Sequence, residues 1–298
     1  MLRAGGLTGR LERAIAAYLG LAIGDALGAT VEFMTPREIA AKYNVHDTIR
    51  GGGWLRLKPG QVTDDTTMAL ALGQSILELG QVTAEGAARA FDAWMRSKPV
   101  DIGNTVRRGI LHYRETGQVE TPENEHDAGN GAAMRVLPVA LATLEQPEEH
   151  VRLACRAQAH VTHNCPLSDA ATECVALMVR DALLGADKIR LLHERAHPLA
   201  RRHAEFTFRS VRQQGNPSGY VPDTIRAVFQ GFFDTDSFED CLTDVVNRGG
   251  DADTTGAIAG MLAGAVYGLD AIPERWLEAL NPEIRHACET QAAALITL

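Results

Sequence analysis

Two short segments of the chain place acidic and hydroxyl side chains directly before an apolar run. One is Thr63-Asp64-Asp65-Thr66-Thr67, and the other is Asp251-Ala252-Asp253-Thr254-Thr255. Clustered carboxylate and hydroxyl oxygens are the hard ligands that Mg²⁺ and Mn²⁺ prefer. Four carboxylates in one place repel one another unless cations neutralise them. If the two segments meet in space, we therefore expect a pair of divalent ions about 3.5–4 Å apart.

The same residues also have a purely structural explanation. Asp and Thr at the start of a helix accept hydrogen bonds from its first free N–H groups, and Asp favours the positive end of the helix dipole. A cap needs one such residue or two, whereas each segment holds at least four. Both explanations stay open at this point, because spacing along the chain does not show whether the segments are neighbours.

Further motifs extend the pattern over residues 20–268. They are Gly24-Asp25-Ala26-Leu27-Gly28 with Glu32, Gly129-Asn130-Gly131-Ala132-Ala133-Met134-Arg135, Thr162-His163, Ser218-Gly219-Tyr220-Val221 and Asn247-Arg248-Gly249-Gly250-Asp251. Together with the two acidic segments, and in this order, they resemble the ADP-ribosylglycohydrolase family. The resemblance implies an all-α orthogonal helical bundle, in a single domain over residues 1–298, with a dinuclear Mn²⁺ or Mg²⁺ centre at one end of a cleft.

The resemblance also implies roles for individual residues. Glu32 would approach the metal centre and the ribose, and Asp101 would handle a proton at the ribose or at the departing guanidine. Without the resemblance, the position of Asp101 favours a structural role, as the N-cap of a helix that starts at Ile102. The metal ligands carried over by motif are Thr63, Asp64, Asp65, Asp251, Asp253 and Thr254.

A second group of residues is expected to bind the rest of an ADP-ribose. The small residues of the Gly129–Arg135 motif precede a helix, where backbone N–H groups can approach a pyrophosphate without obstruction. Tyr220 stands in a glycine-containing loop and could stack on adenine, although a loop Tyr commonly packs locally. The substrate-binding set is Gly129, Asn130, Gly131, Met134, His163 and Tyr220.

Helical periodicity predicts the elements that carry these residues. Apolar side chains recur at helical spacing from Leu11 to Ala22 and from Met68 to Leu79. Strand-like runs are scarce, and the best candidate for a strand is the short run Phe206 to Val211. Further helices are predicted over 84–95, 102–115, 131–144, 147–160, 166–184, 187–203, 223–233, 237–246, 254–268, 273–280 and 283–296.

Two of the predicted helices carry glycine at every fourth position. These are Gly20, Gly24 and Gly28 in one, and Gly256, Gly260, Gly264 and Gly268 in the other. A four-residue period places them on one stripe of each helix. An interior glycine costs a helix about 0.5–1 kcal/mol relative to alanine, so we expect close backbone packing of two central helices that fixes the separation of the acidic residues beside them.

Composition narrows the function classes. The chain has 298 residues, 45% of them hydrophobic, and a formal net charge of −9, which disfavours a nucleic-acid partner. Its apolar runs are shorter than a membrane-spanning helix needs, and it starts without a secretory leader pattern. Five cysteines without a CxxC pair suit free thiols in a reducing compartment, so we expect a cytoplasmic protein.

The resemblance implies an enzyme that removes ADP-ribose from arginine on a target protein. Compact length and the Asp101-Ile102-Gly103-Asn104 segment are most similar to the bacterial branch that reactivates ADP-ribosylated dinitrogenase reductase. That branch suggests a PII-type regulatory protein and an ammonium channel as partners, the latter giving reversible membrane association. Two alternatives remain: hydrolysis of serine-linked or other O-linked ADP-ribose, and a family member that binds ADP-ribose without cleaving it.

Overall fold

The computed structural model describes residues 4–298, and these form helices without a strand. The helices are α1 (Ala4–Gly28), α2 (Pro36–Tyr43), α3 (Asp64–Leu79), α4 (Ala84–Arg96), α5 (Asn104–Thr116), α6 (Gly131–Met134), α7 (Leu137–Ala142), α8 (Glu148–Ala159), α9 (Pro166–Leu183), α10 (Lys188–Leu191), α11 (His197–Arg202), α12 (Val221–Asp234), α13 (Phe238–Val246), α14 (Ala252–Tyr267), α15 (Glu274–Ala279) and α16 (Pro282–Leu295). The all-α prediction is confirmed.

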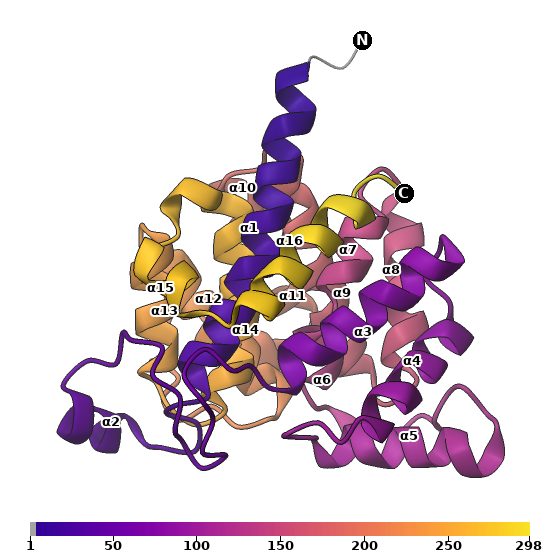
Figure 1. Cartoon of the computed structure of the whole chain (residues 1–298), viewed down its shortest axis with the longest axis horizontal. Helices are drawn as coiled ribbons and strands as arrows, with labels where there is room; N and C mark the ends of the chain where they lie inside the picture. Colours follow the sequence, from indigo (N-terminus) through magenta and orange to yellow (C-terminus); the bar gives the residue numbers. More distant parts are fainter. Residues whose placement is uncertain (1–3) are drawn as a thin grey trace.

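The long helix α1 organises the molecule. It passes through the body of the bundle, and its N-terminal turns extend beyond the other helices (Figure 1). Helix α14 packs along it, and α3, α13 and α16 surround this central pair. The C-terminal end of α1 lies at the opposite end of the molecule from its projecting start (Figure 1).

Helices α1 and α14 meet through their backbones. A Cβ built on Gly20 would lie 2.1 Å from the carbonyl oxygen of Gly260, and one built on Gly24 would lie 2.0 Å from that of Gly256. Side chains of any size would separate the two helices, so glycine is required here despite its cost to the helix. The expected close packing is confirmed for six of the seven glycines. The exception is Gly268, which follows the last residue of α14 and has φ +80°.

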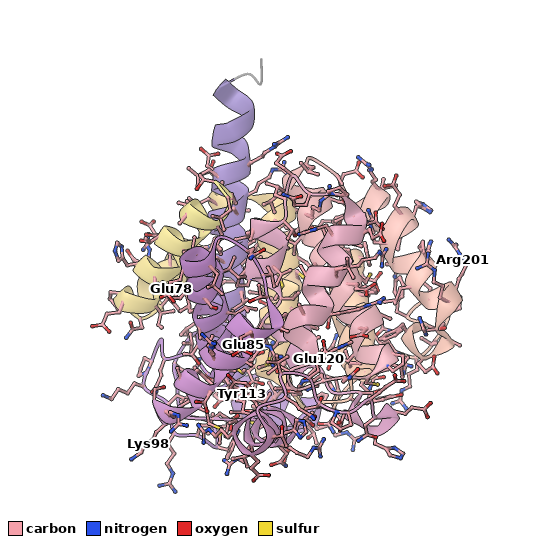
Figure 2. The ribbon with its side chains drawn as sticks, turned by 90° about the vertical axis from the view of Figure 1, so that its right-hand side faces the viewer. Glu78, Glu85, Lys98, Tyr113, Glu120 and Arg201 are labelled. Atoms are coloured by element: carbon pink, nitrogen blue, oxygen red, sulfur yellow. The ribbon has the colours of Figure 1, made fainter. Side chains whose placement is uncertain are left out.

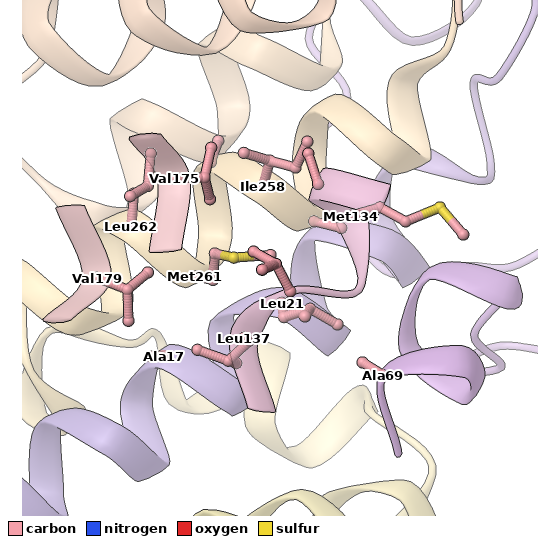
Figure 3. Close-up of a cluster of buried hydrophobic side chains, with 14 of the residues drawn as sticks. Ala17, Leu21, Ala69, Met134, Leu137, Val175, Val179, Ile258, Met261 and Leu262 are labelled. Atoms are coloured by element: carbon pink, nitrogen blue, oxygen red, sulfur yellow. The ribbon is translucent and has the colours of Figure 1, made fainter. Parts of the chain in front are cut away.

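The core is continuous and almost entirely aliphatic around this central pair. Leu21 of α1, Met261 of α14 and Val175 of α9 are completely buried, and Leu137 joins them from α7 (Figure 3). Ala17 and Ala69 are the small members of the same cluster (Figure 3). This mixture of small and large side chains fits helices that approach at different distances.

The strand predicted over Phe206–Val211 is wrong. Residues Ala204–Phe206 form one 3₁₀ turn, and the following segment is irregular. The side chains of Arg226 and Gln230 on α12 donate to the carbonyl oxygens of Thr207 and Phe208, at 3.0 and 3.1 Å. Side chains therefore satisfy the backbone groups that a partner strand would have satisfied.

Several predicted helices are interrupted or shifted. The stretch 131–144 divides into α6 and α7, and Pro138 occupies the first turn of α7. The stretch 187–203 divides around a π-helical turn, Leu192–Ala196, before Pro198. Proline lacks the N–H that would continue the preceding helix, which explains both divisions. Helix α2 was not predicted; Thr35 and Glu38 form a capping box at its start.

Charged side chains cover the surface of the bundle. Figure 2 shows Glu85 of α4 and Tyr113 of α5 close together, and the Tyr113 hydroxyl donates to the Glu85 carboxylate at 3.1 Å. Lys98 projects from the loop that joins these helices (Figure 2), and the same loop carries Asp101. Among residues 4–298, no helix has the length and hydropathy needed to cross a membrane.

Candidate metal centre and substrate cavity

The two acidic segments are neighbours in space. Asp64 is the first residue of α3, and Asp253 lies in the first turn of α14. The Thr254 hydroxyl donates to Oδ2 of Asp65 at 3.4 Å, which links the segments directly. The condition on which the metal prediction depended is therefore met. Neither Thr63 nor Asp251 caps its helix with its side chain in the described structure.

Asp25 of α1 orients the first acidic segment. Its carboxylate accepts hydrogen bonds from the backbone N–H and the hydroxyl of Thr63, each at 3.0 Å, and from the same two groups of Thr66 at 3.1 and 2.5 Å. Burial raises the pKa of Asp25 to about 6, against these bonds. The sequence predicted Asp25 only as part of the Gly24–Gly28 motif and without a role, because nothing local distinguishes it from other acids at the end of an apolar run.

Three carboxylates converge at the mouth of the site. One carboxylate oxygen from each of Glu32, Asp101 and Asp253 lies within 4.8 Å of the other two. Asp101 was expected either to act on substrate or to cap a helix that starts at Ile102. Its carboxylate does accept from the Ile102 N–H, at 2.7 Å, but α5 starts at Asn104 with Gly103 as its N-cap. The predicted cap at Asp101 is wrong.

The carboxylates of the site hold protons unusually tightly. Burial, followed by the repulsion of Asp251, Asp101 and Asp64, raises the pKa of Glu32 to about 8, even though a hydrogen bond from Trp54 opposes the shift. Burial and then Asp101 raise the pKa of Asp64 to about 7. Burial is also the main cause that raises the pKa values of Asp65, Asp251 and Asp253, and repulsion from neighbouring carboxylates adds to it.

This set of side chains fits divalent cations. Oδ1 of Asp65 is buried and has no hydrogen-bond partner among residues 4–298, which leaves an acceptor unsatisfied inside the site. A buried acceptor of that kind costs about 1–3 kcal/mol unless a donor or a cation reaches it. Carboxylate and hydroxyl oxygens from two helix starts supply the hard ligands that Mn²⁺ and Mg²⁺ use.

The acidic residues open onto a cavity of about 470 Å³. Most of the residues predicted to act on or bind substrate line it, from segments far apart in the sequence. Thr63, Asp65 and Tyr220 lie outside the described lining, which consists of Glu32, Phe33, Trp54, Asp64, Asp101, Ile102, Gly103, Asn104, Thr105, Val106, Gly129, Asn130, Gly131, Met134, His163, Gly219, Asp251, Asp253 and Thr254.

The glycine-rich wall of the cavity differs from its expected form. The N–H groups of Gly129 and Asn130 donate to the carbonyl oxygens of Asp127 and Gly219, at 2.8 and 3.1 Å, and are thus used within the loops. The helix that follows, α6, is only four residues long. Asn130 contributes through its side chain instead, because its amide donates to Oδ2 of Asp251 at 2.6 Å.

A chain of buried hydrogen bonds fixes the ring of His163. The Arg135 guanidinium donates to the Thr162 hydroxyl at 2.8 Å, and that hydroxyl lies 2.8 Å from Nδ1 of His163. Arginine only donates, so the hydroxyl hydrogen is left for Nδ1 and the ring carries its own hydrogen on Nε2. Burial and the nearby Arg135 keep the pKa of His163 well below its usual value, so the ring is neutral. Nε2 faces Gly129 and Gly131 at the cavity wall.

Tyr220 is 43% exposed and forms an isolated antiparallel bridge with Gly129, so it lies beside the cavity. Its stacking on adenine stays a prediction.

Comparison with known proteins agrees with this geometry. The chain is 50% identical to the ADP-ribosyl-[dinitrogen reductase] glycohydrolase of Rhodospirillum rubrum, over 96% of each chain. It is 33% identical to an ADP-ribosylarginine hydrolase of Serratia proteamaculans, covering 92% of this chain and 77% of that one. A solved structure described as an ADP-ribosylglycohydrolase-related protein complex superposes with a TM-score of 0.85 at 37% identity, over 97% of this chain and 99% of that one. The profile of the ADP-ribosylglycohydrolases matches residues 7–298, and the chain therefore belongs to this family of hydrolases.

Proposed function

We propose that this enzyme hydrolyses the bond between ADP-ribose and an arginine side chain on a protein, using two divalent metal ions. The observation that carries the proposal is the convergence of Glu32, Asp64, Asp101, Asp251 and Asp253 on one cavity. Such a set of buried carboxylates is stable as anions only beside cations. The Serratia relative is an ADP-ribosylarginine hydrolase, which supports arginine as the linkage residue.

The metal ions would be held by Thr63, Asp64, Asp65, Asp251, Asp253 and Thr254, and Mn²⁺ is our first candidate, with Mg²⁺ the alternative. When bound, such ions supply Lewis-acid chemistry, in that they hold hydroxyl oxygens of a ribose and lower the pKa of water toward neutrality. Thr254 ties the two segments together through its bond to Asp65, and Asn130 holds Asp251 from a third segment. Asp25 keeps the start of α3 in place from behind.

The chain's own side chains have separate tasks in this proposal. Asp101 lies close to Glu32 and Asp253, and there it handles a proton at the ribose or the departing guanidine. Glu32 approaches the ribose. His163 presents its Nε2 hydrogen to the cavity and serves as a neutral donor to an anionic group, with Gly129, Gly131 and Met134 forming the wall around it. Tyr220 stacks on the adenine.

We further infer that the protein substrate is ADP-ribosylated dinitrogenase reductase, so that the enzyme takes part in the regulation of nitrogen fixation. The support is the 50% identity to the Rhodospirillum enzyme over nearly the whole of both chains. In this proposal a PII-type protein and an ammonium channel regulate the enzyme and bring it reversibly to the membrane. The family match over residues 7–298 supports a single domain, and five buried free thiols among the described residues support the cytoplasm.

One experiment tests the proposal directly. Release of ADP-ribose should be measured from arginine-linked and from serine-linked protein substrates, with Mn²⁺ and with a chelator. We expect release from the arginine-linked substrate that needs Mn²⁺. Release from the serine-linked substrate alone would replace the proposed linkage, and full release in chelator would contradict the metal centre. Binding of ADP-ribose without release from either substrate would identify a non-catalytic family member.

A further inference from the structure

The loop Arg50–Lys58 has no part in the function described so far, yet glycines and backbone hydrogen bonds fix its conformation. Gly51, Gly52 and Gly53 all have positive φ angles, of +66°, +80° and +68°. Gly52 and Leu57 exchange two backbone hydrogen bonds, and a Cβ on Gly53 would lie 2.3 Å from the carbonyl oxygen of Ala29. The loop is thus pressed against the chain that follows α1, which leaves the next residue, Trp54, in a fixed position.

Trp54 reaches the carboxylate cluster. Its indole N–H donates to Oε2 of Glu32 at 2.5 Å, and this is a charge-assisted bond when Glu32 is ionised. The ring itself is 52% exposed and lies at the cavity. The ring of Phe33 is 5.4 Å away, centroid to centroid, at an interplanar angle of 50°. The two rings form one aromatic wall, which we call the Phe33–Trp54 pair.

The backbone of Phe33 is held in an unfavourable conformation. Its φ of +63° is rare for a bulky residue, and two hydrogen bonds maintain it. The Phe33 N–H donates to the carbonyl oxygen of Gly250 at 2.7 Å, and the Gly250 N–H donates to the carbonyl oxygen of Met34 at 2.9 Å. The result is a side chain that is 64% exposed in the lining of a polar cavity. Backbone strain that ends in an exposed apolar ring is typical of a functional position.

The carboxylates around the Phe33–Trp54 pair favour a cationic ligand. Phe33 follows Glu32 directly, and the carboxylates of Glu32 and Asp101 come within 4.8 Å of each other; neither is among the proposed metal ligands, so the ions do not neutralise them. These carboxylates repel a pyrophosphate and attract a cation, and aromatic faces bind cations through their quadrupole. A guanidinium is planar and always charged, so it can stack on a ring while donating hydrogen bonds to carboxylates.

We infer that the Phe33–Trp54 pair binds the guanidinium of the target arginine and so determines selectivity for the arginine linkage. This inference rests on the proposed function, because it concerns the leaving group of that reaction. A serine leaving group has neither the charge nor the plane that the pair would bind.

The test compares Phe33→Leu with Phe33→Tyr, since Phe33 acts through its ring alone. With Mn²⁺ and an arginine-linked ADP-ribosyl peptide, Phe33→Leu should raise KM about 10-fold, the scale of a cation–π contact, with kcat changed far less. The dissociation constant for ADP-ribose should stay within about twofold of the wild-type value. Phe33→Tyr keeps the aromatic face and should restore KM. Ile189→Ala, on α10 at 68% exposure, is a control for truncating an exposed apolar side chain.

A second measurement does not depend on turnover. Trp94 and Trp276 are 7% and 1% exposed, so quenching of tryptophan emission by acrylamide reports chiefly on Trp54. In chelator, where the peptide is not consumed, the arginine-linked peptide should protect the emission more than ADP-ribose does. Trp54→Phe should abolish that difference.

The outcomes separate this inference from the proposed function. A wild-type enzyme that fails to cleave the arginine-linked peptide would overturn the proposed function and the inference together. Cleavage by the wild type with an unchanged KM in Phe33→Leu would overturn the inference alone. A rise in the ADP-ribose dissociation constant equal to the rise in KM would also overturn it, because the ring would then contact the nucleotide.

Discussion

Asp253 shows how a single carboxylate can be costly to the fold and necessary to the site. It is 2% exposed, and repulsion by Asp65, Glu32 and Asp251 adds to the burial that raises its pKa. At a pH where the cluster is ionised, we expect Asp253→Ala to stabilise the metal-free protein, because one repelling charge is removed. The same change should abolish the increase in melting temperature that Mn²⁺ gives the wild type, and reduce activity greatly. Calorimetry with and without Mn²⁺ measures both effects. Full Mn²⁺-dependent turnover in Asp253→Ala or in Asp64→Ala would contradict the dinuclear centre.

Asp101 can be separated from the metal ligands by a conservative change. Asp101→Asn keeps the volume and the acceptor for the Ile102 N–H but removes the negative charge and the basicity. If Asp101 handles a proton, turnover should fall by about 10²-fold or more while the Mn²⁺-induced rise in melting temperature persists. Near-normal turnover would return Asp101 to a structural role. Loss of the Mn²⁺ response would instead make it a metal ligand beside Glu32 and Asp253.

The hydrogen-bond chain to His163 gives a prediction about a tautomer. Thr162→Val removes the hydroxyl that lies 2.8 Å from Nδ1, so we expect His163 to change from the pure Nε2–H form to a mixture of tautomers. ¹⁵N NMR of labelled histidine detects the change, and KM should rise with it. Thr143→Val is the control: its hydroxyl is also buried but bonds the Val139 carbonyl, so it should cost stability without altering His163. An unchanged ¹⁵N spectrum in Thr162→Val would contradict the assignment.

At the scale of single residues, the sequence indicated which residue types form the site better than it indicated which residues contact one another. The two acidic segments were predicted because their composition exceeds what a cap needs, and that argument is local. Asp25, Phe33 and Trp54 were not predicted, because their importance comes from partners 20 or more positions distant, at Thr63, Gly250 and Glu32. A carboxylate that orients another segment looks, in one sequence, like any acid at the end of an apolar run.

At the level of elements, the backbone contact between α1 and α14 gives the strongest prediction. Gly24→Ala places a Cβ 2.0 Å from the Gly256 carbonyl oxygen, and only movement of one backbone can relieve that contact. We expect a loss of about 1–3 kcal/mol in the free energy of unfolding, the usual range for overpacking. Gly9→Ala, in the same helix, is the matched control. A Cβ on Gly9 meets nothing within 4 Å among the described residues, so this change should be neutral or add up to about 1 kcal/mol.

Chemical denaturation of both variants measures these changes in the free energy of unfolding. Equal stability of Gly24→Ala and Gly9→Ala would show that α1 and α14 can move apart freely. If Gly24→Ala also weakens Mn²⁺ binding, the backbone contact fixes the separation of the carboxylates as well as the fold.

Periodicity predicted that most of the helices exist, but it did not predict where they begin and end. Residues 131–144 have a helical apolar pattern throughout, yet the chain divides at Arg135 and Val136 so that Arg135 can turn inward to Gln158 and Thr162. Phe206–Val211 alternates like a strand because Phe206 and Phe208 are both buried, but the neighbours that bury them are helices. Pro138 marks the first division in the sequence itself. The second case depends on tertiary contacts, which local patterns do not record.

For the whole molecule, the raised pKa values predict how stability depends on pH. In the metal-free protein, Asp25, Asp64 and Glu32 have pKa values of about 6, 7 and 8, whereas the ordinary values of these groups in an unfolded chain are 3.8, 3.8 and 4.5. The folded state therefore holds these protons more tightly. The stability that they contribute is complete below about pH 4 and is lost as pH rises through 6 to 8.

Thermal unfolding between pH 4 and 9 measures this loss, and Mn²⁺ should reverse it because it replaces the missing protons. Asp64→Asn isolates one contribution, since its loss of stability with pH should be smaller than that of the wild type. A metal-free wild type whose stability rises from pH 6 to 8 by more than that of Asp64→Asn would contradict the protonated carboxylates.

The glycine contacts between α1 and α14 also limit how the length of this chain can vary in evolution. One residue inserted between Gly20 and Gly28 turns the rest of α1 by about 100° relative to its neighbour and replaces each contacting glycine with a larger residue. No side chain stands between the backbones to absorb the mismatch. In a library of random insertions selected for activity, this stretch should be empty, whereas insertions before Gly9, where α1 extends beyond the bundle (Figure 1), should survive.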